Sequence, residues 1–418
     1  MLRRKVLVFV VADLVNQHGG NLWLQSLFHV LSMMDELEIT VVTSGRKQAS
    51  EGNECVVRGF GFNHIFVPLG VPLPEATPSL ISRVLGACCD KYYFNLERWA
   101  RRQASVDSTL SGIAQTYRPD LILVSDIWSA MCCPSLFEEC APCCLITLND
   151  EVRFHRASRM IAGPVESGFS SSLERAIHRN WNWIANFRHE RYTDALWKKC
   201  AGVVALTTSD LPPNLPRHTV KAVLPPLLKE REVRWRYSAA RSLLFVGNIW
   251  HFPNRLALKW LCTSLSPALL SIDNSIVINI IGCDREQWPG SDDLQNVRFL
   301  GRGSYRDVIH HMTTDDMFVA PIENAYGAKL KLVECASMGM PFVATDSAMS
   351  GLPFIKCVPR FELDSPTETA KTIAEMLDTP AVLLNMSREI ITEMSEARIE
   401  QAKSWKRFLG DAMAARIV

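Results

Sequence analysis

Short apolar runs alternate with longer amphipathic segments along the chain, and this alternation constrains the fold more than any other feature. In the first half, residues 5–11, 37–44, 121–125, 144–148 and 202–206 form such runs. Continuous apolar runs of this length are typical of parallel strands that are covered on both faces. Segments of helical character lie between them, at residues 20–34 and 173–199 among others. We therefore expect an α/β fold with a doubly wound parallel sheet.

A second set of the same kind fills the other half of the chain. Its apolar runs are residues 243–246, 276–281, 297–300, 317–320 and 342–344, and the helical segments expected are residues 253–265, 305–312, 329–338 and 366–377. The two sets are separated by Leu224-Pro225-Pro226 and a charged stretch at 229–241. We expect two Rossmann-like domains, because 418 residues exceed what one core usually serves.

The predicted boundaries follow from this pattern. We expect an N-terminal domain at residues 1–235, a second domain at 240–390 and a C-terminal helical segment at 391–418. The basic residues at 3–5 and the apolar run after them are interpreted as a first strand and not as a signal peptide. No apolar run approaches the ~20 residues that span a bilayer, so a cytoplasmic location is expected.

Composition excludes several classes of protein. Hydrophobic residues make up 48% and charged residues 21% of the chain, which is typical of a globular protein. The net charge of +1 provides no general attraction for nucleic acid, so an anion site must be local. The 13 cysteines include three adjacent pairs, and we interpret them as reduced core residues. Cys140, Cys143 and Cys144 lack a second pair at metal-ligand spacing, so no metal site is expected.

The segment 327–345 carries the clearest chemical signal. Gly327 and Ala328 precede Lys329 and Lys331 at the predicted start of a helix, just after a predicted strand. The first amides of a helix have no internal partner and the helix dipole adds positive potential, so this end attracts a phosphate. The two lysines add charge. The sequence therefore predicts an anion site here.

Glu334 is predicted to lie one helical turn after Lys331, on about the same face. A carboxylate at that place can accept hydrogen bonds from the 2′- and 3′-hydroxyls of a ribose beside the phosphate. The less specific interpretation is a surface helix on which Glu334 pairs with Lys331.

This segment resembles the donor-binding signature of the retaining GT-B glycosyltransferases of group 1. In that family, Gly-x-Arg/Lys-x-Lys-x-x-Glu opens a helix and Gly-x-Pro-hydrophobic-Val-x-Thr follows it, as residues 327–334 and 339–345 do here. The resemblance implies that Gly327, Ala328, Lys329 and Lys331 bind the diphosphate of a nucleotide sugar and that Glu334 binds the ribose. Many members carry a further glutamate eight residues earlier, where this chain has Tyr326.

Other segments resemble the same family and imply further site residues. The run 244–248 resembles the strand and glycine turn that open the donor domain, so Gly247 and Asn248 would approach the donor phosphates. Arg302 and Tyr305 follow the strand whose loop lines the base pocket. Gly19 and Gly20 follow the first strand, where the absence of a Cβ lets the backbone approach a sugar phosphate. By the same resemblance, the polar pair after the 144–148 strand, Asn149 and Asp150, would lie near the anomeric carbon as catalytic residues.

The resemblance implies a GT-B fold, with two Rossmann-like domains facing across a cleft, and a metal-independent hexosyltransferase that retains anomeric configuration. Its co-substrate would be a UDP-, GDP- or ADP-sugar, with no other cofactor. The acceptor would be a glycan, a lipid-linked or a small molecule, and nucleic acid is not an expected partner. A peripheral membrane contact stays open. Two alternatives also stay open: an inactive GT-B protein that acts as a sugar-nucleotide sensor or partner subunit, and a nucleotide-sugar 2-epimerase.

Overall fold

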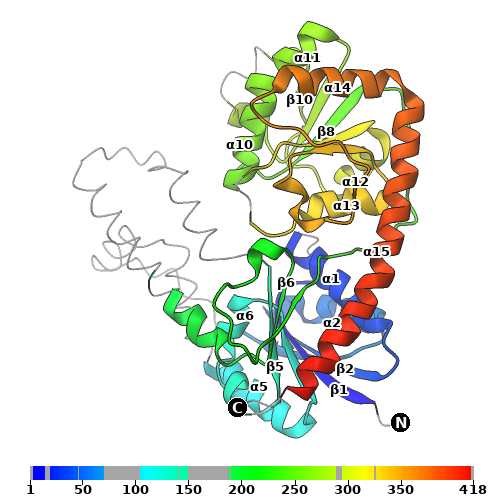
Figure 1. Ribbon diagram of the computed structural model, residues 1–418. Coiled ribbons are helices and arrows are strands. Elements are labelled where there is room, and N and C mark those ends of the chain that lie inside the picture. Colours follow the sequence, from blue (N-terminus) through cyan, green and yellow to red (C-terminus); the bar gives the residue numbers. More distant parts are fainter. Residues whose placement is uncertain are drawn as a thin grey trace, which may run out of the picture. The chain divides into compact units, whose positions relative to one another are not determined.

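The computed structural model describes residues 3–14, 19–45, 47–69, 104–139, 141–148, 187, 190–288, 294–323 and 326–415. The chain divides into two compact units, whose elements are labelled in Figure 1. Unit 1 comprises Met1–Leu224 together with Ala402–Val418, and unit 2 comprises Pro225–Gln401. The charged stretch 229–241 belongs to unit 2, where the indole of Trp235 donates a hydrogen bond to the carbonyl oxygen of Asp315 (2.8 Å).

Unit 1 is built on a seven-stranded parallel sheet with the strand order β3-β2-β1-β4-β5-β6-β7. Its strands are β1 (Arg4–Val11), β2 (Leu37–Gly45), β3 (Asn63–Pro68), β4 (Leu121–Val124), β5 (Cys143–Thr147), β6 (Gly202–Ala205) and β7 (Val220–Val223). The five strands predicted in this half are confirmed. The edge strands β3 and β7 were not predicted, because exposed and half-buried edge positions interrupt the apolar run that marks a central strand.

Helices cover the sheet of unit 1, as a parallel sheet requires (Figure 1). They are α1 (Gly19–Ser32), α2 (Ser50–Gly59), α5 (Ala104–Tyr117), α6 (Ile127–Cys132) and α7 (Leu136–Glu139). One core cluster joins β1, β4 and β5 to α5, α6 and α7. The cysteines in and next to this cluster are buried: Cys132, Cys133, Cys143, Cys144 and Cys200. Burial raises the pKa of Cys132 to about 12, and none of the ten cysteines that the structure describes is in a disulfide.

Unit 2 contains a five-stranded parallel sheet in the order β10-β9-β8-β11-β12. The strands are β8 (Ser242–Val246), β9 (Val277–Ile281), β10 (Val297–Phe299), β11 (Met317–Ala320) and β12 (Phe342–Ala344), and all five were predicted. The helices are α10 (Phe252–Trp260), α11 (Ser266–Ile272), α12 (Tyr305–Thr314), α13 (Leu330–Met338) and α14 (Pro366–Asp378). Two sheets of this order form two Rossmann-like domains.

The helix predicted at 253–265 is longer than expected. A π-helical turn, η3 (Leu261–Leu265), joins α10 to α11, so helical structure continues to Ile272. Pro267 near the start of α11 has no N–H to donate, and a wider turn in front of it accommodates this loss.

The long helix α15 (Pro380–Ala414) ends in unit 1. There Phe408 is buried against Gly202 of β6: a Cβ built on that glycine would lie 2.8 Å from the Phe408 ring and 2.7 Å from Cys144 Sγ. Lys406 forms an ion pair with Glu36 at 2.6 Å. Glycine at position 202 is therefore required by the close packing of α15 on the sheet of unit 1.

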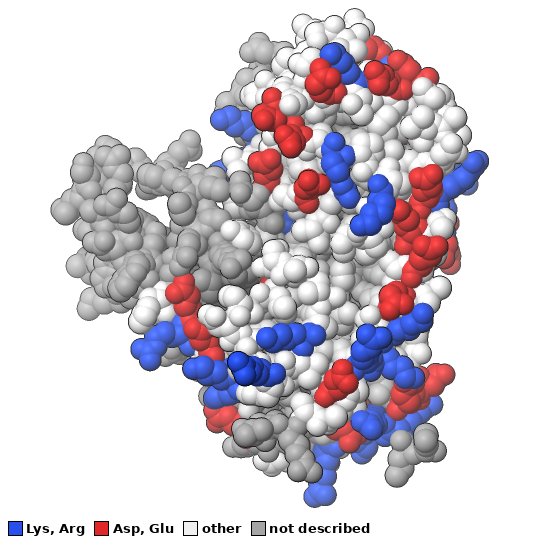
Figure 2. Space-filling view, viewed as in Figure 1, with Lys and Arg blue, Asp and Glu red and all other residues white. Residues whose placement is uncertain are grey.

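Charges of both signs are interspersed on the face of the molecule that Figure 2 shows, as the net charge of +1 suggests. No helix within the described ranges has the length and apolar character needed to cross a membrane. Across these same ranges, histidine, cysteine and carboxylate side chains do not gather in threes as metal ligands would.

The same substitution at two glycines tests the packing of α15. We expect Gly202→Ala to lower the free energy of unfolding of unit 1 by about 1–3 kcal/mol, because Phe408 and Cys144 must move. Gly410→Ala is the control, since no atom lies within 4 Å of a Cβ at this helical position. It should raise stability by about 0.5–1 kcal/mol. Urea unfolding followed by circular dichroism measures both, and equal effects of the two variants would contradict this packing.

Candidate functional site

The N-terminal turn of α13 begins where the sequence predicted the start of a helix. Gly327 has φ +76°, a left-handed conformation that favours glycine. Lys329 is the N-cap residue, and the first helical hydrogen bonds run from the amides of Leu332 (2.8 Å) and Val333 (3.2 Å) to its carbonyl oxygen. The amides of Leu330 and Lys331 therefore precede the first helical bond. Amides at this position are suited to bind an anion.

Lys331 is the best-held cation of this turn. Its half-buried ammonium group donates hydrogen bonds to the carbonyl oxygen of Val246 (2.5 Å) and to Oδ1 of Asn254 (2.8 Å). It also lies 4.7 Å from the centre of the Phe245 ring. Both hydrogen-bond acceptors are neutral, and no carboxylate of a described residue pairs with this ammonium. Its charge therefore remains available to an anion.

The surroundings of Lys331 change its pKa. Burial, and then the repulsion of the Lys329 ammonium, lower the pKa of Lys331 from 10.5 to about 7. Loss of surrounding water, with Lys331 and Lys329 nearby, also lowers the pKa of His251 to about 4. A site that disfavours additional positive charge in this way is stabilised when an anion binds.

The turn after β8 supplies the acceptors for Lys331. Gly247 leaves space for Asn254, whose Cγ would lie 2.7 Å from a Cβ at that position. Nδ2 of Asn254 donates to the carbonyl oxygen of Asn248 (3.0 Å), which ties the start of α10 to this turn. Gly282, with φ +109°, lies against the Gly247 backbone, because a Cβ there would be 2.4 Å from the Gly247 carbonyl oxygen. The glycines at 247 and 282 are thus required by close backbone approach.

Lys329 is held differently. Its ammonium donates to the carbonyl oxygen of Tyr326 (2.8 Å) and to that of Gly327, so it folds back over the turn that precedes α13. Ala328 lies next to Gly351, where a Cβ would be 2.5 Å from the Ala328 Cβ. The turn is therefore packed closely on both sides.

Glu334 lies one turn into α13 and is 4% exposed. Its Oε1 accepts hydrogen bonds from the Tyr305 hydroxyl and from Nη2 of Arg231 (3.1 Å). The structure thus brings Tyr305 and Glu334 together, as two of the residues predicted for one site. Arg231 was not predicted, because it lies in the charged stretch before β8, where nothing in the sequence distinguishes it from six other charged residues of the stretch 229–241. The Glu334–Lys331 pair of the alternative interpretation is not formed, since the partner of Glu334 is Arg231.

The remaining predicted residues are less closely held or lie elsewhere. Arg302 is exposed and approaches Asp284 at 4.0 Å. Gly19 and Gly20 are the first residues of α1 in unit 1. Asn149 and Asp150, predicted as catalytic, lie outside the described residues.

Two described polar residues, Ser125 and Asp126, follow β4 in unit 1, and Asp126 is the ionisable one. Its carboxylate accepts hydrogen bonds from the amide of Ser129 (2.8 Å) and the hydroxyl of Ser125 (2.6 Å). The bond from the Ser129 amide caps the short helix α6. The geometry of Asp126 is thus accounted for by a helix cap.

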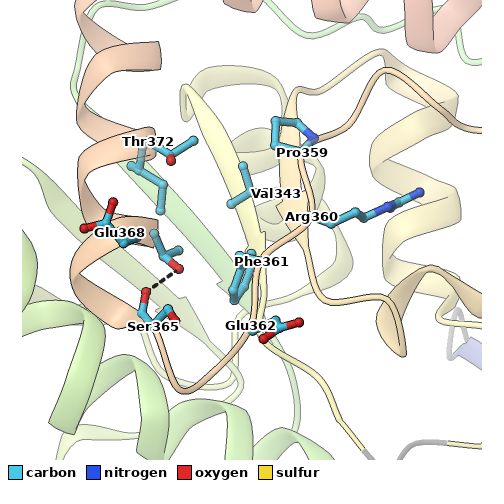
Figure 3. A pocket seen from close by; sticks show the side chains of 10 residues that line it. Val343, Pro359, Arg360, Phe361, Glu362, Ser365, Glu368 and Thr372 are labelled. Atoms are coloured by element: carbon cyan, nitrogen blue, oxygen red, sulfur yellow. Dashed lines mark hydrogen bonds between the residues drawn. The ribbon is translucent and has the colours of Figure 1, made fainter.

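A hollow of about 240 Å³ lies beside β12 and the start of α14. Figure 3 shows Glu362, Glu368 and Arg360 among its lining residues. Two carboxylates and one guanidinium give this lining a net negative charge, which does not favour a diphosphate. None of the predicted donor-binding residues lines this hollow, and we do not assign the anion site to it.

Comparisons with known proteins agree with the features of unit 2. Residues 240–379 match the family described as glycosyl transferases group 1. No curated protein matches the chain in a sequence search.

Solved structures resemble most or nearly all of the chain at low sequence identity. The crystal structure of TarM has a TM-score of 0.63 and 10% identity, with 98% of each chain covered. Sucrose-phosphate synthase from Thermosynechococcus elongatus has a TM-score of 0.61 and 12% identity, covering 97% of this chain and 100% of that one. A mutant S. aureus TarM bound to fondaparinux, alpha-GlcNAc-glycerol and UDP has a TM-score of 0.50 and 11% identity, covering 71% and 57%.

These likenesses establish the fold, and the family match places the glycosyltransferase signature in unit 2. The chain has the GT-B fold, and its residues 240–379 match the group 1 glycosyltransferase family.

Proposed function

We propose that the protein transfers a sugar from a nucleotide-sugar donor to an acceptor hydroxyl. The observation that carries this proposal is the Lys331 ammonium, held by neutral acceptors beside the first amides of α13. This arrangement provides positive charge and free N–H groups at one point, which is what a diphosphate needs. The group 1 family match supports a nucleotide sugar as the source of that diphosphate.

In the proposed reaction, the bond between the anomeric carbon and a diphosphate oxygen breaks. The acceptor oxygen bonds to the same carbon, and its proton passes to the departing diphosphate or to solvent. Negative charge builds up on the nucleoside diphosphate as it leaves, and the Lys331 ammonium and the amides of α13 would offset it. Preorganised charges and dipoles of this kind are often the largest contribution to catalysis.

Finer features of the reaction rest on the family resemblance alone. On that basis we propose retention of anomeric configuration and a reaction without a metal ion. The proposed donor is a UDP-, GDP- or ADP-sugar, and UDP-sugars are the first to test because UDP is bound in a TarM structure of similar fold. Gly19, Gly20, Asn149 and Asp150 stay proposed as the contribution of the N-terminal half to the sugar and the anomeric carbon.

The first test is binding of the donor. A screen of UDP-, GDP- and ADP-sugars should raise the melting temperature with at least one of them, because a ligand that binds the native state stabilises it. Lys331→Met should weaken the binding of that nucleotide sugar by about 10- to 100-fold, since a charge-assisted hydrogen bond is lost.

The matched control is Lys371→Met, because Lys371 is an exposed lysine of α14 paired with Glu368. It should bind like the wild type. Slow release of nucleoside diphosphate from the bound sugar would support a transferase, whereas binding without release would indicate a sugar-nucleotide sensor. Unchanged binding by Lys331→Met would contradict the proposed site.

A second test uses pH. The free protein holds Lys331 with a pKa of about 7, and a bound diphosphate would raise that pKa. Binding therefore takes up a proton above pH 7, and affinity should fall with rising pH by up to about tenfold per unit.

Isothermal titration with a nucleotide sugar between pH 6 and pH 8.5 measures this effect. The nucleotide sugar is preferable to the free nucleotide, since its diphosphate has no terminal group that titrates in this range. In Lys331→Arg the slope should flatten, because arginine stays charged. A wild-type affinity independent of pH would argue against contact between Lys331 and the diphosphate.

A further inference from the structure

Arg231 connects the segment before β8 to the acidic residue of α13. It lies 103 residues before Glu334 in the sequence, and its Nη2 is 3.1 Å from Glu334 Oε1. The same Nη2 donates to the Tyr305 hydroxyl at 2.6 Å, and the guanidinium carbon lies 6.0 Å from the centre of the tyrosine ring. Three segments distant in sequence therefore meet at one carboxylate.

The hydrogen bonds at this carboxylate are unequally distributed. Oε1 of Glu334 accepts both bonds, from Tyr305 and from Arg231. Its Oε2 accepts none from the residues that the structure describes. The side chain is 5% exposed, so the fold fixes one oxygen of a nearly buried carboxylate and leaves the other without a protein donor. A ligand hydroxyl is a suitable donor for this second oxygen.

The position of Arg231 also leaves one of its hydrogen-bond donors unsatisfied, which costs the folded state some stability. Its Nε is buried and has no hydrogen-bond partner among the described residues. Buried polar groups are nearly always paired, and exceptions gather at functional sites. An arginine that served only to stabilise this segment would be expected to use this donor as well.

We propose that Arg231 and Tyr305 are positioning residues that keep the Glu334 carboxylate ionised and oriented, so that its Oε2 accepts hydrogen bonds from the ribose hydroxyls of the bound nucleotide. This rests on the proposed function, because it requires a nucleotide beside the N-terminal turn of α13. On this proposal, the selection of ribose over deoxyribose depends on Arg231, which lies in the segment before the sheet of unit 2.

The charges around Glu334 agree with this assignment. Burial raises the pKa of Glu334, while the hydrogen bond from Tyr305 and the charge of Arg231 lower it. In the same environment, burial and the nearby Glu334 raise the pKa of Tyr305, so the tyrosine hydroxyl keeps its proton and donates a hydrogen bond to Glu334. Cys335, the next residue on α13, has its pKa raised by burial and stays neutral. Without Arg231, the pKa of Glu334 must rise, and Glu334 then takes up a proton and loses its charge as pH falls.

The test compares a nucleoside diphosphate with its 2′-deoxy analogue, using UDP, GDP or ADP according to which of them binds. In the wild type, the ribose form should bind about 10- to 100-fold more tightly at every pH from 6 to 8.5. In Arg231→Met, this ratio should fall to nearly one at pH 6 and recover partly at pH 8.5, as Glu334 ionises. Arg231→Lys, which restores the charge, should retain more of the ratio at pH 6.

Two further variants complete the design. Tyr305→Phe should lower the ratio in the same direction, and it tests the proposal if Arg231→Met does not fold. Arg388→Met is the matched control, because Arg388 is an exposed arginine of unit 2 on α15, and its ratio should equal that of the wild type.

Two results would overturn the inference. One leaves the proposed function intact, and the other contradicts it as well. If Glu334→Gln abolishes the preference for ribose while Arg231→Met and Tyr305→Phe keep it at pH 6, then Glu334 binds ribose without their help. The proposed function then stands and the positioning role is wrong. If no nucleoside diphosphate binds to the wild type, the proposed function itself is wrong and the inference is overturned with it.

Discussion

The ammonium group of Lys331 joins three elements of unit 2 at the point where a nucleotide is proposed to bind. It belongs to α13, and it donates to the end of β8 through Val246 and to α10 through Asn254. A half-buried cation needs such acceptors, because an unpaired one is strongly destabilising. The neutral acceptors hold the group in place without cancelling its charge. The same contacts therefore organise the fold locally and keep the cation ready for an anion.

That arrangement requires the glycines of this region. Gly247 admits the Asn254 side chain that holds Lys331, and Gly282 admits the backbone of Gly247. Gly327 and Gly339, both with positive φ, begin and end the segment that contains α13. One turn of helix then separates the proposed phosphate group, Lys331, from the proposed ribose group, Glu334. This spacing suits a nucleotide, in which phosphate and ribose are covalent neighbours.

The sequence predicted the fold of both units well where strands are central. The strands β8, β11 and β12 are buried, so their apolar runs are unbroken and their bounds could be predicted to within a residue. The edge strands β3 and β7 carry exposed residues such as Asn63 and Lys221 at or near their ends, and this weakens the pattern. Within the site, Lys331 and Glu334 were recognised because they lie close together in one motif.

The partners of these two residues could not be recognised in the same way. Asn254 and Arg231 reach them from 77 and 103 residues away, so no local spacing connects them. Only the sheet order, which places the end of β8 beside β11 and the turn that follows it, brings these side chains together. Hydrogen bonds of this kind depend on tertiary structure, and residues that hold a motif in position are therefore the part of a site most easily missed in a single sequence.

A crystal structure of the protein grown with the nucleotide sugar that stabilises it most would test the central claim directly. The diphosphate should lie within hydrogen-bond distance of the Leu330 and Lys331 amides and of the Lys331 ammonium, with the ribose against Glu334. A diphosphate bound away from this turn, for example in the hollow beside α14, would contradict it.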